Sequence, residues 1–122
     1  MVSWSEIEAI VSTFRTCIPV AGSKREWCVN KKAIAWERPL SKKDMAALGA
    51  AAPKGAVLAI HLADVMARDA WVETVPGPCF VSPHFANYPA VLVDLEKADL
   101  QLVTELLNES YEYLLTRQDD NR

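Results

Sequence analysis

The sequence predicts an α+β fold, in which an antiparallel sheet of about five strands carries helices packed on one face. First, segments with helical periodicity alternate with short apolar segments, in the order α-β-β-α-β-α-β-β-α. Second, 122 residues, of which 51% are apolar, suffice for one domain with a buried core. Third, the uncharged stretch 74–93 contains four prolines, so it cannot form a helix and is interpreted as two buried strands and a loop. We treat residues 1–122 as one domain and expect residues 118–122, which are polar, to be frayed.

The first expected element is an amphipathic helix over residues 4–15. Its apolar residues recur at helical spacing and therefore lie on one face: Trp4, Ile7, Val11 and Phe14. Ser3 followed by Glu6 fits a capping box, in which each side chain bonds the backbone N–H of the other residue.

Residues 25–29 and 33–38 are predicted to form a β-hairpin, because apolar and polar residues alternate in both segments. Residues 30–32 form the turn, since Asn30 tolerates a positive φ. The alternation gives two expected pairs of neighbours on one face: Trp27 with Val29, and Ile34 with Trp36.

A short helix is expected next, beginning after Ser41 and ending near Gly49. Ser41 and Asp44 have the spacing of an N-cap residue and its partner in the first turn. Met45 and Leu48 are expected to face the core.

The second half of the chain is expected to contain three more strands and two more helices. Along the chain these elements cover residues 57–62, 64–72, 80–81, 90–93 and the residues from 99 onward. The final helix has an apolar stripe that should be buried: Leu102, Val103, Leu106, Leu107, Tyr111 and Leu114. Its outward carboxylates, Glu105, Glu109 and Glu112, are interpreted as a solvated helix face, with binding of a hard cation as the alternative.

Cysteine usage and the N-terminal sequence predict a soluble, cytoplasmic protein. The cysteines, Cys17, Cys28 and Cys79, are odd in number and include no CxxC pair, whereas a secreted chain of this size more often has an even set. Residues 1–20 have neither the basic start nor the apolar run of a signal peptide. No membrane partner is expected, because the prolines in residues 74–93 break any spanning helix.

The sequence has no recognisable catalytic motif, and we expect neither an enzyme nor a metal or cofactor site. It contains no GxSxG element, no Walker loop and no GxGxxG motif. The residues that could ligate zinc, Cys28, His61, Cys79 and His84, are too scattered for a zinc site. Cys79 and His84 would suit a thiol–imidazole pair, but a buried structural cysteine is the favoured interpretation.

A basic segment follows the first helix and is the strongest indication of function. Residues 24–43 contain seven basic and two acidic residues, although the whole chain has a net charge of −3. The basic residues are Lys24, Arg25, Lys31, Lys32, Arg38, Lys42 and Lys43. Cations clustered on a projecting hairpin can contact a phosphate backbone, and ordinary solvated lysines are the alternative interpretation.

The uncharged loop at residues 82–89 is a second candidate surface. It displays His84, Phe85 and Tyr88 between two prolines, and Trp36 of the hairpin is a further candidate contact. Loops carry binding residues more often than cores do. Aromatic side chains at this position could stack on bases or line a pocket for another ligand.

Three phrases of the sequence resemble the MmcQ/YjbR family: AWERPLSKKD at residues 35–44, SPHF at 82–85 and YPAVLV at 88–93. The order of the segments is similar to that family over about residues 4–116. The resemblance implies a fold like that of the bacterial frataxin homologue CyaY, an antiparallel sheet with helices on one side. It also implies DNA binding through two protruding wings, which on this chain are the hairpin around residues 30–32 and the loop 82–89.

Two functional hypotheses follow. The first is weak binding of DNA, in which the basic residues contact phosphates while His84, Phe85 and Tyr88 contact a groove or stack on bases. The second is a domain that binds a protein or a small ligand through the loop 82–89 and binds no nucleic acid. The first hypothesis predicts binding that weakens steeply with salt, and the second predicts salt-tolerant binding.

Overall fold

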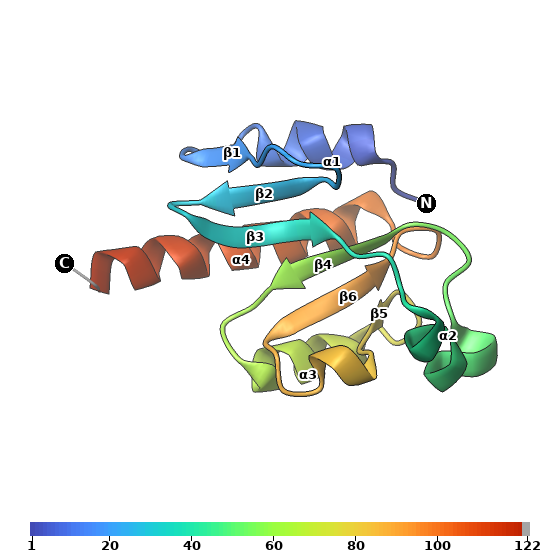
Figure 1. Cartoon of the computed structure of the whole chain (residues 1–122). Coiled ribbons are helices and arrows are strands. Elements are labelled where there is room, and N and C mark those ends of the chain that lie inside the picture. Colours follow the sequence, from blue (N-terminus) through green and yellow to red (C-terminus); the bar gives the residue numbers. More distant parts are fainter. Residues whose placement is uncertain (121–122) are drawn as a thin grey trace.

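The structure is a computed structural model that describes residues 1–120 of the chain. Within those residues it contains helices and strands in a mixed order, with two short 3₁₀ turns (Figure 1). The elements are α1 (Trp4–Val11), β1 (Cys17–Pro19), β2 (Glu26–Val29), β3 (Lys32–Glu37), α2 (Lys42–Leu48), η1 (Gly49–Ala51), β4 (Val57–His61), α3 (Val65–Thr74), β5 (Cys79–Phe80), η2 (Pro83–Phe85), β6 (Ala90–Asp94) and α4 (Leu100–Asp120). The predicted α+β class is confirmed.

The strands form one six-stranded sheet in the order β1-β2-β3-β4-β6-β5, and all neighbours are antiparallel. β1 was not predicted, because three residues are too few to show a strand pattern. The chain reaches β1 through Thr16, whose φ of 67° reverses its direction after α1. The predicted helix 4–15 therefore ends early, at Val11, although its capping box at Ser3 and Glu6 is present.

The hairpin of β2 and β3 is confirmed, and its turn is tighter than predicted. Asn30 and Lys31 have φ values of 53° and 71°, which are the values of a two-residue hairpin turn that matches the twist of its strands. Lys32 pairs with Val29 and so belongs to β3 rather than to the turn.

A β-bulge in this hairpin corrects one prediction. Trp27 pairs with Ala35 and Cys28 pairs with Ala33, so Ile34 is an extra residue on β3. The bulge shifts the alternation of side chains, and Ile34 and Ala35 are both fully buried in the main core. Trp36 consequently lies on the opposite face of the sheet, and the prediction that it shares a face with Ile34 is wrong.

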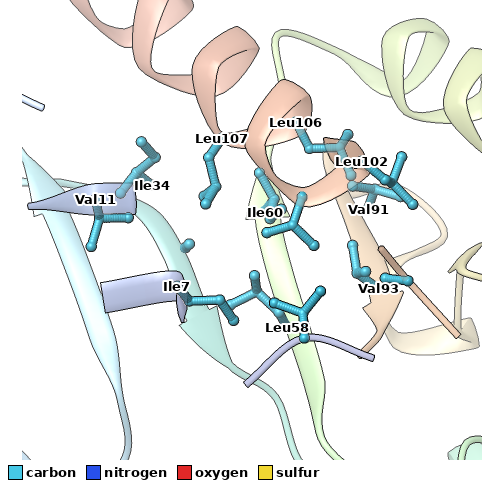
Figure 2. Packing of buried hydrophobic residues seen from close by; sticks show 14 of the residues in the cluster. Ile7, Val11, Ile34, Leu58, Ile60, Val91, Val93, Leu102, Leu106 and Leu107 are labelled. Atoms are coloured by element: carbon cyan, nitrogen blue, oxygen red, sulfur yellow. The ribbon is translucent and has the colours of Figure 1, made fainter. Parts of the chain in front are cut away.

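One face of the sheet carries the main core, which is covered by α1, α3 and α4. Figure 2 shows its centre, where side chains of α1 and α4 meet those of the central strands. The predicted stripe of α4 is buried as expected at Leu102, Val103, Leu106, Leu107 and Leu114, and Tyr111 is half-buried. The face of the sheet that the helices cover therefore contains most of the buried apolar residues.

The opposite face carries a second, smaller apolar cluster. It consists of buried residues of β4 and β6 with half-buried residues packed on them: Val57, Ala59, Leu92, Trp36, Leu40, Phe80 and Phe85. Phe85 belongs to η2, and Leu40 belongs to the segment that leads into α2. This face is thus covered over β4 and β6 by short segments rather than by a long helix.

Three further predictions differ from the structure in detail. Met45 is 40% exposed and Asp44 is the buried residue of α2, so the expected burial of Met45 is wrong, whereas Leu48 is half-buried. β5 is Cys79–Phe80 instead of 80–81. α4 continues to Asp120, and the rest of the segment expected to be frayed, residues 121–122, lies outside the described residues. No helix among residues 1–120 is both long and apolar enough to cross a membrane.

Replacement of Leu106 by alanine tests the main core. Leu106 is completely buried, so Leu106→Ala should lower the free energy of unfolding by about 2–5 kcal/mol through lost transfer energy and a residual cavity. Urea unfolding followed by circular dichroism measures this loss. The matched control is Met66→Ala, because Met66 is 81% exposed on α3 and its truncation should change stability little. An equal loss in both variants would contradict the described packing.

Candidate aromatic and basic site

An open cavity of about 350 Å³ lies on the sheet face opposite the main core. We call it the aromatic cavity. Its lining residues are Lys24, Arg25, Glu26, Trp36, Glu37, Arg38, Pro39, Phe85 and Tyr88. Three predicted basic residues and three predicted aromatic residues, which come from segments nearly fifty residues apart, therefore border the same space.

The three rings of the aromatic cavity form one cluster. The Trp36 ring meets the rings of Phe85 and Tyr88 edge to face, at centroid distances of 6.4 and 6.3 Å. The Phe85 and Tyr88 rings are 5.5 Å apart and tilted by 32°. Tyr88 is 44% exposed, while Trp36 and Phe85 are half-buried. Tyr88 is thus the ring most accessible to a ligand, and it packs against the two less exposed rings.

Arg68 holds the backbone of the loop that carries two of these rings. Its side chain is 94% buried, and its Nη1 donates hydrogen bonds to the carbonyl oxygens of Phe85, Ala86 and Tyr88, at 2.6, 3.1 and 3.1 Å. Its charge is balanced by Asp69, whose Oδ1 lies 3.0 Å from Nη2. A planar guanidinium with several donors suits this task, because one group can bond several carbonyls at once.

Asp44 links α2 to the same loop. Its buried carboxylate accepts a hydrogen bond from the Ser41 backbone N–H at 3.2 Å and lies 3.0 Å from His84 Nδ1. The guanidinium of Arg38 is 3.7 Å from the other side of this carboxylate and also lies over the Phe85 ring, 5.3 Å from its centroid. Asp44 therefore contacts His84 of the loop 82–89 through one carboxylate oxygen and lies near Arg38 through the other.

The pKa of Asp44 reflects these contacts. Burial alone would raise the pKa of this carboxyl, but the hydrogen bonds from His84 and Ser41 favour the ionised form and leave its pKa below the ordinary value. The folded protein therefore holds Asp44 as a carboxylate more firmly than the unfolded chain does.

The charges around the aromatic cavity are mostly paired. Glu37 accepts hydrogen bonds from the Arg25 backbone and guanidinium at 3.2 and 3.4 Å, and that guanidinium also lies over the Trp4 ring. Arg38 is balanced in part by Asp44. Among the described residues Lys24 forms no ion pair, and Glu26 adds a negative charge to the lining. The cavity is thus only mildly positive.

The remaining predicted site residues lie elsewhere. Lys31 is in the β2–β3 turn, and Lys32 begins β3, whereas Lys42 and Lys43 lie in the first turn of α2, near the other end of β3 (Figure 1). None of these four lysines lines the aromatic cavity. His84 does not line it either, although its ring, with 53% of its side chain exposed, stands beside the loop against Asp44.

The groups considered for other chemistry are placed unfavourably for it. Burial raises the pKa of the Cys79 thiol to about 11 and also raises the pKa values of Cys17 and Cys28, so these thiols stay protonated near neutral pH. Among the residues whose side chains the structure describes, 1–116, no group of three or more His, Cys, Asp or Glu is arranged to hold a metal ion. Glu109 of the acidic helix face accepts a hydrogen bond from Trp71 Nε1 at 3.1 Å.

Sequence reasoning missed the two residues that organise the site. Arg68 is a single arginine in a helix with a weak apolar pattern, so no spacing in the sequence indicates that it is buried. Asp44 was interpreted as a capping residue, which is correct but incomplete. Its position 38 residues before the loop 82–89 is unremarkable in the sequence, and only the fold brings it to His84.

Comparison with known proteins adds relatives but no activity. The chain is 34% identical over 116 residues to an uncharacterised protein found in two strains of Mycobacterium tuberculosis, and to its counterpart in Mycobacterium bovis. The matches cover 91% of this chain and 87% of each relative. No family model matches the chain, and no solved structure does.

Acid titration tests the contacts of Asp44. A lowered pKa means that the carboxylate stabilises the folded state above its ordinary pKa of about 4, and that this contribution is lost as the pH falls through the folded-state pKa. Asp44→Asn should therefore be less stable than wild type at pH 7, and the difference should shrink as the pH falls below about 4. Urea unfolding across this range measures it, and a difference that is independent of pH would contradict the assignment.

Removal of the Arg68 side chain tests the loop anchor. Arg68→Ala should lower the free energy of unfolding by about 2–4 kcal/mol, because three carbonyl groups lose a charged donor and Asp69 loses its partner. Amide hydrogen exchange should speed up most over residues 83–88. Arg15→Ala is the control, because Arg15 is exposed in the segment between α1 and β1 and no side-chain bond of it is present among the described contacts. Uniform acceleration along the chain would contradict a local anchor.

Proposed function

The chain belongs to the family of these uncharacterised mycobacterial proteins, and from its own surface we propose that it is a non-enzymatic module that binds single-stranded nucleic acid, such as DNA, weakly and in a salt-sensitive manner. The proposal includes the MmcQ/YjbR resemblance, carried by the phrases at residues 35–44, 82–85 and 88–93. It also places the protein in the cytoplasm, which suits its free cysteines.

The observation that carries the proposal is the meeting of rings and cations in one open cavity. Tyr88, with Phe85 and Trp36 beneath it, offers an aromatic surface on which a base can stack. Lys24, Arg25 and Arg38 border the same cavity and can approach the phosphates next to that base. A duplex keeps its bases stacked inside, so a single strand fits this arrangement better.

The paired charges explain why the proposed binding is weak. A phosphate can compete with Glu37 for Arg25, because exposed ion pairs contribute at most about 1 kcal/mol. Glu26 and the net charge of −3 oppose an anionic ligand. Lys31 and Lys32 at the β2–β3 turn extend the positive surface for a longer strand, outside the cavity.

A protein or small ligand without phosphates is the second candidate. It is favoured by the same pairing of Arg25 with Glu37 and of Arg38 with Asp44, which leaves rings rather than charges as the main feature of the cavity. Binding of such a ligand would depend on Phe85 and Tyr88 and would tolerate salt. The two candidates therefore differ in one measurable property.

Truncation of Tyr88 tests the proposed stacking surface. With a fluorescein-labelled eight-nucleotide oligothymidylate at about 20 mM salt, Tyr88→Ala should weaken binding roughly tenfold or more, because a stacked base contributes about 1–3 kcal/mol. Fluorescence anisotropy measures the affinity, and a rise to about 200 mM salt should weaken the wild type steeply. Leu100→Ala is the control, since Leu100 is 45% exposed at the start of α4, away from the cavity.

The double substitution Lys31→Glu and Lys32→Glu separates the two candidates. It should weaken binding of the eight-nucleotide strand and reduce its salt dependence, whereas binding of a ligand without phosphates should not change. Absence of any oligonucleotide binding at low salt, with the folded state confirmed by circular dichroism, would overturn the nucleic-acid proposal.

A further inference from the structure

A second open cavity begins where the aromatic cavity ends. It has a volume of about 330 Å³ and shares Glu37, Arg38 and Pro39 with the first cavity. On its far side it is bordered by Met45 of α2 and by the segment that leads into β4, which contributes Lys54 and Gly55 to the lining. We call it the Lys54 cavity. Of its lining residues, the sequence predicted only Arg38 as a site residue.

Arg38 stands at the junction of the two cavities. Its guanidinium lies over the Phe85 ring, which belongs to the aromatic cavity, and 3.7 Å from the carboxylate of Asp44. Its Nη1 donates to the Pro39 carbonyl at 3.0 Å, and its backbone N–H donates to Val57. These contacts fix a cation, 24% exposed in its side chain, between two spaces large enough for small groups.

Lys54 is a second cation in the lining of the Lys54 cavity, in addition to Arg38. Lys54 is exposed and forms no ion pair among the described residues. Glu37 also borders the cavity, but its carboxylate accepts its hydrogen bonds from Arg25. Glu96 lies over Gly55, where an added Cβ would come within 2.5 Å of its Oε1, and this nearby carboxylate limits the positive potential.

We propose that one single strand of nucleic acid crosses both cavities, with a base stacked in the aromatic cavity and the following phosphate held between Arg38 and Lys54. This inference rests on the proposed function and adds a direction and a minimum length to it. The strand passes over Arg38 toward the start of β4, and a ligand must be longer than one nucleotide to use both cavities. The β2–β3 turn, beyond the other end of β3, is then reached only by a longer strand.

Oligothymidylates of one, two, four and eight nucleotides test this path by isothermal titration calorimetry at low salt. The affinity of the wild type should rise between one and four nucleotides, as the ligand comes to span both cavities. Lys54→Gln should weaken binding of the four-nucleotide strand by about threefold or more and should lower the slope of log K against log salt by about 0.7, the contribution of one phosphate contact in a single strand. It should leave binding of the mononucleotide unchanged.

The matched control is Arg15→Gln, which removes one positive charge in the segment between α1 and β1, where the Tyr111 hydroxyl of α4 donates to the Arg15 carbonyl. It should change neither the affinity nor the salt slope, so a general charge effect is distinguished from a contact at Lys54. If Tyr88→Ala abolishes binding while Lys54→Gln behaves like Arg15→Gln, the path over Arg38 is overturned and the proposed function stands. If no strand of any length binds, both are overturned.

Discussion

The central strands β4 and β6 are buried on both faces, and this constraint explains the arrangement of the rest of the molecule. Two faces of a sheet need two covers, because apolar side chains alternate between them. The helices α1, α3 and α4 supply the first cover. The second cover is supplied by Phe85, Leu40 and their neighbours. The loop 82–89, which carries Phe85, is therefore first of all a part of the core. The aromatic cavity adjoins this second cover, because Trp36 and Phe85 belong both to the cover and to the lining of the cavity.

Two polar anchors keep this second cover in place. Arg68 bonds the loop carbonyls from the side of α3, and Asp44 bonds His84 from the side of α2. Both anchors are buried charges whose partners are satisfied, which is the condition under which buried charges are tolerated. The rings are therefore held in position without a ligand, and a ligand that stacks on them need not order the loop first.

The sequence predicted those features that follow from local patterns. Helix caps at Ser3 and Ser41, the hairpin turn at Asn30 and the stripe of α4 all depend on residues close in the chain. The apolar pattern gave a wrong prediction in two places. At Ile34, one inserted residue changes the face of the sheet on which the following residues lie. In α2, Asp44 is the buried residue and Met45 is exposed. The sequence also did not distinguish Arg38, whose guanidinium lies over the Phe85 ring, from Lys31, which does not line the aromatic cavity. Such distinctions depend on contacts between distant segments.

The two edges of the sheet are formed by strands of three and two residues, β1 and β5, and β1 ends in Pro19. A strand this short offers few free backbone groups, and a proline removes one of the donors. Edges of this kind are poor templates for a foreign peptide that would extend the sheet through main-chain hydrogen bonds. The proposed binding therefore relies on side chains, and it should be sensitive to single substitutions on the surface.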